Sequence, residues 1–138
     1  MEINYIAIIV ATVVQFIIGA IWYMPLFGKA WGEIHGFDKI APDVQREMMK
    51  GMMPLLVAQF FLTLLTSAVF GFLLATFPMS WNVYVLASLY WLGFAVPAEI
   101  AAVIFGGTEG KWVMKKIFIS IGGSLVCFLA MAAVFNFI

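Results

Sequence analysis

The sequence predicts an all-α membrane protein, a bundle of four transmembrane helices with a short interfacial amphipathic helix between the first and the second. Composition, the lengths of the apolar runs and the positions of the basic residues predict this fold class. Hydrophobic residues make up 65% of the 138 residues and charged residues 10%, whereas soluble domains contain about 45–50% and about 25%. No polar stretch is long enough for a separate soluble core, so we expect a single domain over residues 1–138.

Four apolar runs are long enough to be spans, because crossing a hydrocarbon core of roughly 30 Å takes about 20 helical residues. They cover approximately Ile3–Tyr23, Pro54–Phe77, Trp81–Phe105 and Ile117–Phe137. The first run has no basic residue before it and is longer than the apolar core of a secretion signal, so we expect it to remain as a span. A short turn around Pro78 joins the second and third spans.

The seven basic residues of the chain all fall in two loops. Between the first and second spans and between the third and fourth they are Lys29, Lys39, Arg46 and Lys50, and Lys111, Lys115 and Lys116. Cytoplasmic loops carry an excess of Lys and Arg, so we expect both loops in the cytoplasm and both termini outside. The inverted orientation is the alternative.

The first loop contains the predicted amphipathic helix, in residues 41–53 (APDVQREMMKGMM). Pro42 suits a first helical turn and Asp43 the positive end of the helix dipole. Apolar residues recur at helical spacing at Val44, Met48, Met49 and Met52. Such a helix lies on the membrane surface; alternatively, it only leads into the second span, with Pro54 as a kink or a new first turn.

Glu99 is the only charged residue in the four apolar runs. Small residues, including Ala95 and Ala102, share its helical face, so we expect that face to look inward. At about 1.5 Å per residue, four polar residues lie roughly 8–12 Å from the cytoplasmic ends of their spans. The sequence therefore predicts an intramembrane polar layer of Glu99, Gln15, Gln59 and Ser124.

Three interpretations of Glu99 remain open. An intramembrane carboxyl often marks the pathway of a proton, a cation or a small cationic solute. A protonated carboxyl can instead form structural hydrogen bonds between helices or subunits. The third interpretation is a carboxyl that reaches water through a cytoplasmic crevice and has little effect.

Several classes of function are excluded by what the sequence lacks. A net charge of 0 and the absence of a phosphate-binding or nucleic-acid motif argue against nucleic-acid partners. His35 is the only histidine and Cys127 the only cysteine, so we expect no metal site, no cofactor and no disulfide. No catalytic trio or carboxylate pair is evident, and we expect no enzyme activity.

A motif marks the end of the first span, in residues 19–31 (GAIWYMPLFGKAW). Its candidate site residues are Trp22, Tyr23, Pro25, Gly28, Lys29 and Trp31. Proline ends a helix, glycine permits a tight turn, lysine reaches phosphate headgroups, and tryptophans anchor the bend at the interface. The alternative is a lipid-headgroup or ligand site at the mouth of the bundle. Gly93–Pro97 weakly repeats Gly19–Pro25, which would place Gln15 and Glu99 in corresponding positions.

This motif resembles the hallmark of the small bacterial membrane proteins grouped as domain of unknown function 1761. The shared features are the Trp-Tyr pair, the proline two residues later, Leu-Phe-Gly-Lys and the following tryptophan. The resemblance extends over nearly the whole chain, through Trp91, Gly93 and the basic stretch EGKWVMKK. It implies four transmembrane helices in a bacterial cytoplasmic membrane, with no established activity.

Two classes of function follow. We first expect a structural, partner-binding or regulatory protein held together by the polar layer around Glu99. Its partner would bind the small-residue ridge of Ser67, Gly71 and Ala75, which permits close helix approach. The alternative is a transporter, or an ion- or proton-translocating protein, that uses Glu99. We expect contact with the lipid bilayer and a homo-oligomer, while the substrate or protein partner stays open.

Overall fold

A computed structural model describes residues 2–77 and 80–138, and these residues form helices and loops without any strand. Four helical segments are long and apolar enough to cross a membrane: Tyr5–Leu26, Met53–Thr76, Val83–Phe105 and Gly110–Phe137. They confirm the four predicted spans to within a few residues, except that the fourth begins earlier. The turn expected around Pro78 lies outside the described residues.

The first span combines α1 (Tyr5–Ile21) with a π-helical turn, η1 (Trp22–Leu26). The Asn4 side chain accepts a hydrogen bond of 2.9 Å from the Ala7 amide and so caps the start of α1. Pro25 lies inside the π-helical turn, where its missing N–H favours departure from α-helical bonding. A second helix, α2 (Gly28–Ile34), follows directly.

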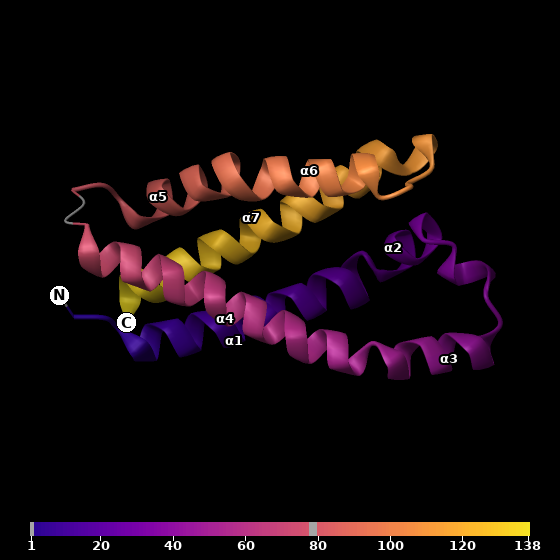
Figure 1. The fold of residues 1–138 in the computed structure, drawn as a ribbon, viewed down its shortest axis with the longest axis horizontal. Coiled ribbons are helices and arrows are strands. Elements are labelled where there is room, and N and C mark those ends of the chain that lie inside the picture. The colour runs from indigo at the N-terminus through magenta and orange to yellow at the C-terminus, as the bar shows by residue number, and fades with distance from the viewer. Residues whose placement is uncertain (1, 78–79) are drawn as a thin grey trace.

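The predicted loop helix forms as α3 (Pro42–Gly51), preceded by a short 3₁₀ turn, η2 (Phe37–Lys39). Pro42 stands in its first turn, as expected. Only Met52 separates α3 from α4 (Met53–Thr76), and α3 continues almost in line with α4 (Figure 1). This geometry agrees with the alternative in which the helix leads into the second span.

The third span is divided in the same manner as the first. It comprises α5 (Val83–Tyr90), a second π-helical turn, η3 (Trp91–Ala95), and α6 (Val96–Phe105), with Pro97 in the first turn of α6. The chain then reverses at Gly107, whose φ of 71° suits glycine, and enters η4 (Gly110–Trp112) and α7 (Val113–Phe137).

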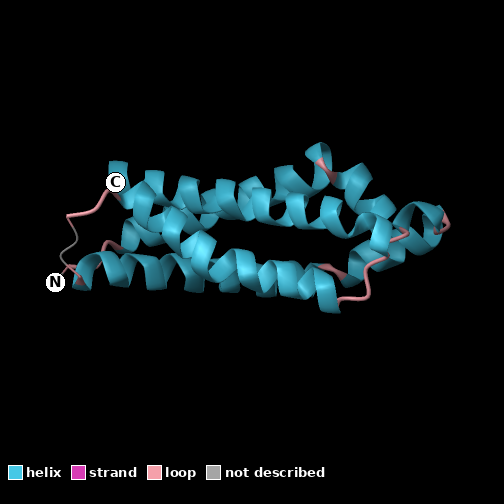
Figure 2. Ribbon diagram, turned by 90° about the horizontal axis from the view of Figure 1, so that it is seen from above, coloured by secondary structure: helices cyan, strands magenta, loops and turns pink. Residues whose placement is uncertain are grey.

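Both basic loops lie at one end of the elongated molecule, which we call the loop end (Figures 1 and 2). The two termini lie at the opposite end, as a four-span chain with same-side loops requires. Helix α7 packs against α1, α5 and α6, whereas α4 packs mainly against α1. The apolar core lies in the half nearer the termini and consists of Ala11, Phe70, Leu86, Ala87, Met131 and Ala132.

The small-residue ridge of α4 packs inside the chain. Ser67 is fully buried, and a Cβ atom added at Gly71 would lie 3.0 Å from both Ile8 and Phe135. Ala75 is half-buried farther along the same helix. Ser67 and Gly71 serve helix packing within one chain, which corrects the expectation that this ridge receives a partner helix.

Candidate functional site

Glu99 lies in the first turn of α6 and faces α7. Its carboxylate is half-buried, and the Ser124 hydroxyl donates a hydrogen bond of 3.1 Å to its Oε2 atom. The structure therefore brings together two of the four residues predicted for the polar layer. No ion pair involves Glu99: the ion pairs in the described part of the chain are Lys50–Glu47 and Lys111–Glu109.

The Ser124 hydroxyl has a second acceptor. The carbonyl oxygen of Ile121 lies 3.1 Å from Ser124 Oγ, the same distance as the carboxylate of Glu99. A serine hydroxyl has a single hydrogen and therefore donates to one of these acceptors at a time. An ionised Glu99 would receive that hydrogen, whereas a protonated Glu99 could donate to Ser124 while the serine donates to Ile121.

Trp91, which belongs to the third span, hydrogen-bonds to Ser124. Its indole Nε1 donates to Ser124 Oγ at 3.0 Å and lies 3.1 Å from the Ile121 carbonyl oxygen. The π-helical turn that begins at Trp91 precedes α6 and places the indole and the carboxylate over the same turn of α7. Sequence reasoning did not assign Trp91 to the site, although an indole N–H in an apolar span needs an acceptor.

Tyr23 approaches the same cluster from the first span. Its side chain lies near those of Ser120, Glu99 and Cys127. Ser120 and Ser124 follow Lys116 at four-residue steps, so the three share one face of α7. This polar face of α7 leads from the loop end to the carboxylate.

Gln15 belongs to a neighbouring polar cluster. It is buried, and its Nε2 atom donates to Ser67 Oγ at 2.8 Å and to the Ala11 carbonyl oxygen at 3.2 Å. The Cys127 thiol, 3.7 Å from the Gln15 carbonyl oxygen, links this cluster to α7. The predicted single layer is thus divided between two contacts, α6 with α7 and α1 with α4.

Gln59 does not join either cluster. Its side chain is exposed and donates, at 3.4 Å, to the hydroxyl of Thr63 on its own helix. Depth in the membrane was the reason to group it with Glu99, but depth does not fix the direction in which a helix presents a residue. The structure therefore corrects the inclusion of Gln59.

The motif at the end of the first span makes contacts inside the molecule. The Trp22 indole donates to the Ile119 carbonyl oxygen at 2.9 Å and packs against Gly122 and Gly123, where an added Cβ would lie 3.1 and 2.9 Å from it. Tyr23 and Trp31 pack edge to face, with ring centroids 4.8 Å apart. A Cβ at Gly28 would lie 3.2 Å from the Tyr23 carbonyl oxygen, whereas Lys29 is exposed.

The weak internal repeat has a structural counterpart. Trp22 and Trp91 each begin a π-helical turn and each donate an indole N–H to a carbonyl oxygen of α7, at Ile119 and Ile121. Gln15, however, precedes its π-helical turn and Glu99 follows the other. The two residues therefore do not occupy corresponding positions.

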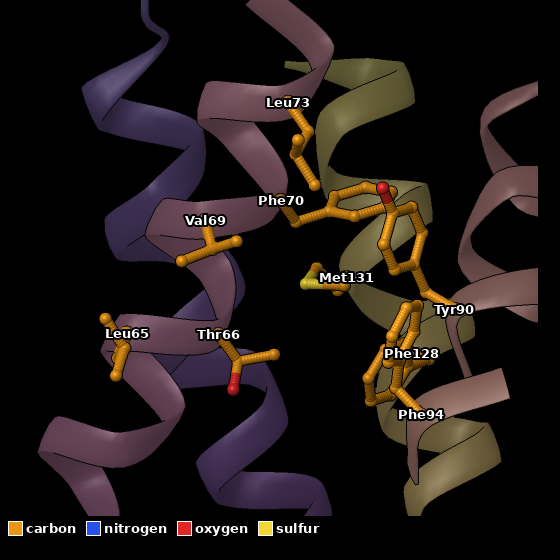
Figure 3. Close-up of a pocket in the computed structure, with 9 residues that line it drawn as sticks. All are labelled: Leu65, Thr66, Val69, Phe70, Leu73, Tyr90, Phe94, Phe128 and Met131. Atoms are coloured by element: carbon orange, nitrogen blue, oxygen red, sulfur yellow. The ribbon is translucent and has the colours of Figure 1, made fainter.

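Two hollows accompany these clusters. An apolar groove of about 270 Å³ separates aliphatic residues of α4 from Tyr90, Phe94 and Phe128, with Met131 between them (Figure 3). A polar cavity of about 550 Å³ lies at the loop end, between residues 33–39 and 106–116. Among the described residues, no group of three or more His, Cys, Asp or Glu side chains could hold a metal ion.

A comparison with protein families tests the family resemblance that the Trp-Tyr motif predicts. The family described as protein of unknown function (DUF1761) matches residues 6–136. The chain belongs to the DUF1761 family. No curated protein and no solved structure matches this DUF1761 chain. The family description carries no activity, so an argument about function rests on the geometry around Glu99.

Proposed function

We propose that this protein binds a proton or a small cation reversibly at Glu99 within the membrane, as part of a transport or ion-translocating function. One observation supports this proposal: the Glu99 carboxylate lies inside an apolar span and forms no ion pair with a cationic side chain of residues 2–77 and 80–138. An isolated carboxylate there is costly, by about 2.5 kcal/mol or more. Uptake of a proton or a cation removes that cost.

Reversibility is supported by the hydroxyl of Ser124. Its two acceptors, Glu99 and Ile121, allow it to hydrogen-bond with the carboxyl in the charged and in the neutral state. Little rearrangement of the backbone is then needed when Glu99 gains or loses its proton. The half-exposure of Glu99 leaves room for exchange with a ligand.

The structural alternative rests on a different observation. Two indoles, Trp22 and Trp91, donate to carbonyl oxygens of α7 and so tie the first and third spans to the fourth. In that case Glu99 is one more interhelical hydrogen-bonding group. Replacement of Glu99 by glutamine would then leave assembly and every flux unchanged.

Orientation and assembly are parts of the same proposal. We place the protein in a bacterial cytoplasmic membrane, as the family resemblance implies, and the excess of lysine and arginine at the loop end favours an orientation with this end in the cytoplasm. A homo-oligomer would supply further helices around a pathway for which four helices form only a thin wall. Binding and transport, rather than catalysis, are the activities proposed.

The test is carboxyl infrared difference spectroscopy on the protein in lipid, titrated with pH and with candidate cations. We expect a carboxyl band that responds to protons or to one cation and that disappears in Glu99→Gln. The matched control is Glu47→Gln, because Glu47 is exposed on α3 and paired with Lys50. A correctly folded Glu99→Gln protein with wild-type spectra and wild-type proton and cation flux in liposomes would end the proposal.

A further inference from the structure

The polar cavity at the loop end has the dimensions of a ligand site. Its volume of about 550 Å³ falls within the range of roughly 300–1,000 Å³ that is usual for such sites. One wall comes from residues 33–39 and the other from residues 106–116, which belong to the two separate basic loops. Gly36 and Gly107, with φ of 69° and 71°, turn the chain in these walls.

The lining of the cavity carries both signs of charge. Lys39 and Lys116 are its cations besides Lys111, and Glu33 and Asp38 are its anions besides Glu109. Lys111 and Glu109 pair with each other at 3.6 Å, whereas no ion pair within the described residues joins the other four. Lys116 instead lies over the Trp31 ring, 5.6 Å from its centroid.

Thr108 adds an unsatisfied polar group. It lines the cavity, and its hydroxyl oxygen is buried without a hydrogen-bond partner. Buried polar groups in proteins are almost always hydrogen-bonded, so a group without a protein partner calls for an explanation, of which a bound water or ion is one. Because this oxygen is shielded from the cavity, the Thr108 side chain would have to rotate before its hydroxyl could donate to a phosphate oxygen.

We propose that this cavity binds a zwitterion that combines a phosphate with a primary ammonium group, the chemistry of a phosphoethanolamine headgroup. Lys39 and Lys116 serve the phosphate, because cations are its usual partners, and a rotated Thr108 hydroxyl would add a donor. Glu33 and Asp38 serve the ammonium. A zwitterion matches both sets of side chains, whereas a ligand with only one charge matches one set.

The level of the cavity favours a membrane lipid as the source. The third apolar span ends at Phe105, immediately before one wall, whereas the first ends at Leu26 and is followed by α2, whose last two residues belong to the other wall. Trp112 lies under Lys111 and Lys115, at 5.4 and 5.3 Å from its ring centroid. Tryptophan and lysine are typical of the headgroup region. Soluble phosphoethanolamine presents the same groups and is the other source to be tested.

The experiment measures lipid retention by native mass spectrometry of the purified full chain supplied with phosphatidylethanolamine, phosphatidylcholine or phosphatidylglycerol. Phosphatidylcholine keeps the phosphate but lacks N–H donors, and phosphatidylglycerol lacks the ammonium. We expect phosphatidylethanolamine to bind about tenfold more tightly than either, as the loss of one charge-assisted hydrogen bond implies. Equal retention of the three lipids, together with no binding of soluble phosphoethanolamine, would overturn the proposal.

Two variants test separately the side chains assigned to the phosphate and to the ammonium group of the ligand. Lys39→Gln should weaken binding of phosphatidylethanolamine and phosphatidylglycerol alike, whereas Asp38→Asn should weaken only phosphatidylethanolamine. Both residues are exposed, so the variants should fold, and Lys50→Gln on α3, outside the cavity, is the control. Retention unchanged by both cavity variants would overturn the site. Binding of phosphoethanolamine alone, lost in both, would support the zwitterion site with a soluble ligand.

Discussion

Ser124 Oγ lies 3.1 Å from the carboxylate of Glu99, and this contact joins the third span to the fourth at the acidic residue of the third span. The serine is fixed from the other side by the Trp91 indole at 3.0 Å. A hydroxyl held in this way can follow the charge of the carboxyl by rotation alone. The pair is therefore a direct target for testing whether Glu99 exchanges a proton.

Ser124→Ala should change the vibrational signature of Glu99. The substitution removes the only side-chain hydrogen bond to the carboxylate among residues 2–77 and 80–138. We expect the C=O stretching band of the protonated carboxyl to move to higher wavenumber, because a carboxyl with fewer hydrogen bonds has a stiffer C=O bond. The measurement is infrared difference spectroscopy in lipid.

Thr63→Ala is the control for this experiment, since the Thr63 hydroxyl donates only to the Gln59 carbonyl oxygen within α4. It should leave the Glu99 band in place. An unchanged band in Ser124→Ala would show that the serine does not bond to the carboxyl in the membrane.

Gly123→Ala should destabilise the protein. The added Cβ would lie 2.9 Å from two atoms of the Trp22 indole, which is rigid and is held by its hydrogen bond to Ile119. Overpacking of this kind costs about 1–3 kcal/mol in free energy of unfolding. Thermal or detergent-induced unfolding, followed by tryptophan fluorescence, measures the change.

Gly19→Ala is the matched glycine substitution, because nothing lies within 4 Å of a Cβ added there. Alanine is also a better helix former than glycine, by about 1 kcal/mol. The control should therefore be neutral or stabilising. A Gly123→Ala protein as stable as Gly19→Ala would contradict the position of the Trp22 indole against α7.

The sequence predicted the spans well because their signal is carried by many residues at once. About 20 apolar residues define each span, so the loss of one residue changes little. The Trp-Tyr motif likewise identified the family, which matches residues 6–136. Within the site, Glu99 and Ser124 were found because each stands on a stripe of small residues that favours helix contact.

The rest of the site depends on rotation of the helices, which composition does not determine. Gln15 and Gln59 have similar predicted depths, yet the first is buried against Ser67 and the second is exposed. The π-helical turns at Trp22 and Trp91 also change the rotation of each span along its length. The adjacent glycines, Gly122 and Gly123, were the available signal that a large ring would pack there.

Gln15 and Ser67 should show coupled effects on stability. Their hydrogen bond of 2.8 Å is buried and joins α1 to α4. Interhelical hydrogen bonds in membranes contribute about 0.6 kcal/mol on average and at most about 1.7. We expect a coupling energy in this range from a double-mutant cycle of Gln15→Leu and Ser67→Ala.

The control cycle pairs Gln59→Leu with Ser67→Ala. Gln59 bonds to Thr63 on its own helix and has no hydrogen bond to Ser67 in the structure. The two substitutions should be additive. A coupling as large as that of Gln15 would mean that the energy measured for Gln15 and Ser67 does not come from their hydrogen bond.

Water should reach Ser120 from the loop end. Ser120 is half-buried on the polar face of α7, between Lys116, which lines the loop-end cavity, and Ser124, which contacts Glu99. A Ser120→Cys variant in a Cys127→Ala background should react with a water-soluble thiol reagent added from that side. Thiols react as thiolates, which form in water and not in lipid.

Phe118→Cys, in the same background, is the stringent control for that labelling. Phe118 lies closer to the loop end than Ser120, but it belongs to the apolar surface of α7 and is 63% exposed. If depth alone governed access, its cysteine would react faster. We expect the reverse, because the polar face of α7 admits water and the apolar surface contacts lipid. If Phe118→Cys reacted with the reagent and Ser120→Cys did not, the polar face would be ruled out as a route to Glu99. The infrared test of proton binding would be unaffected.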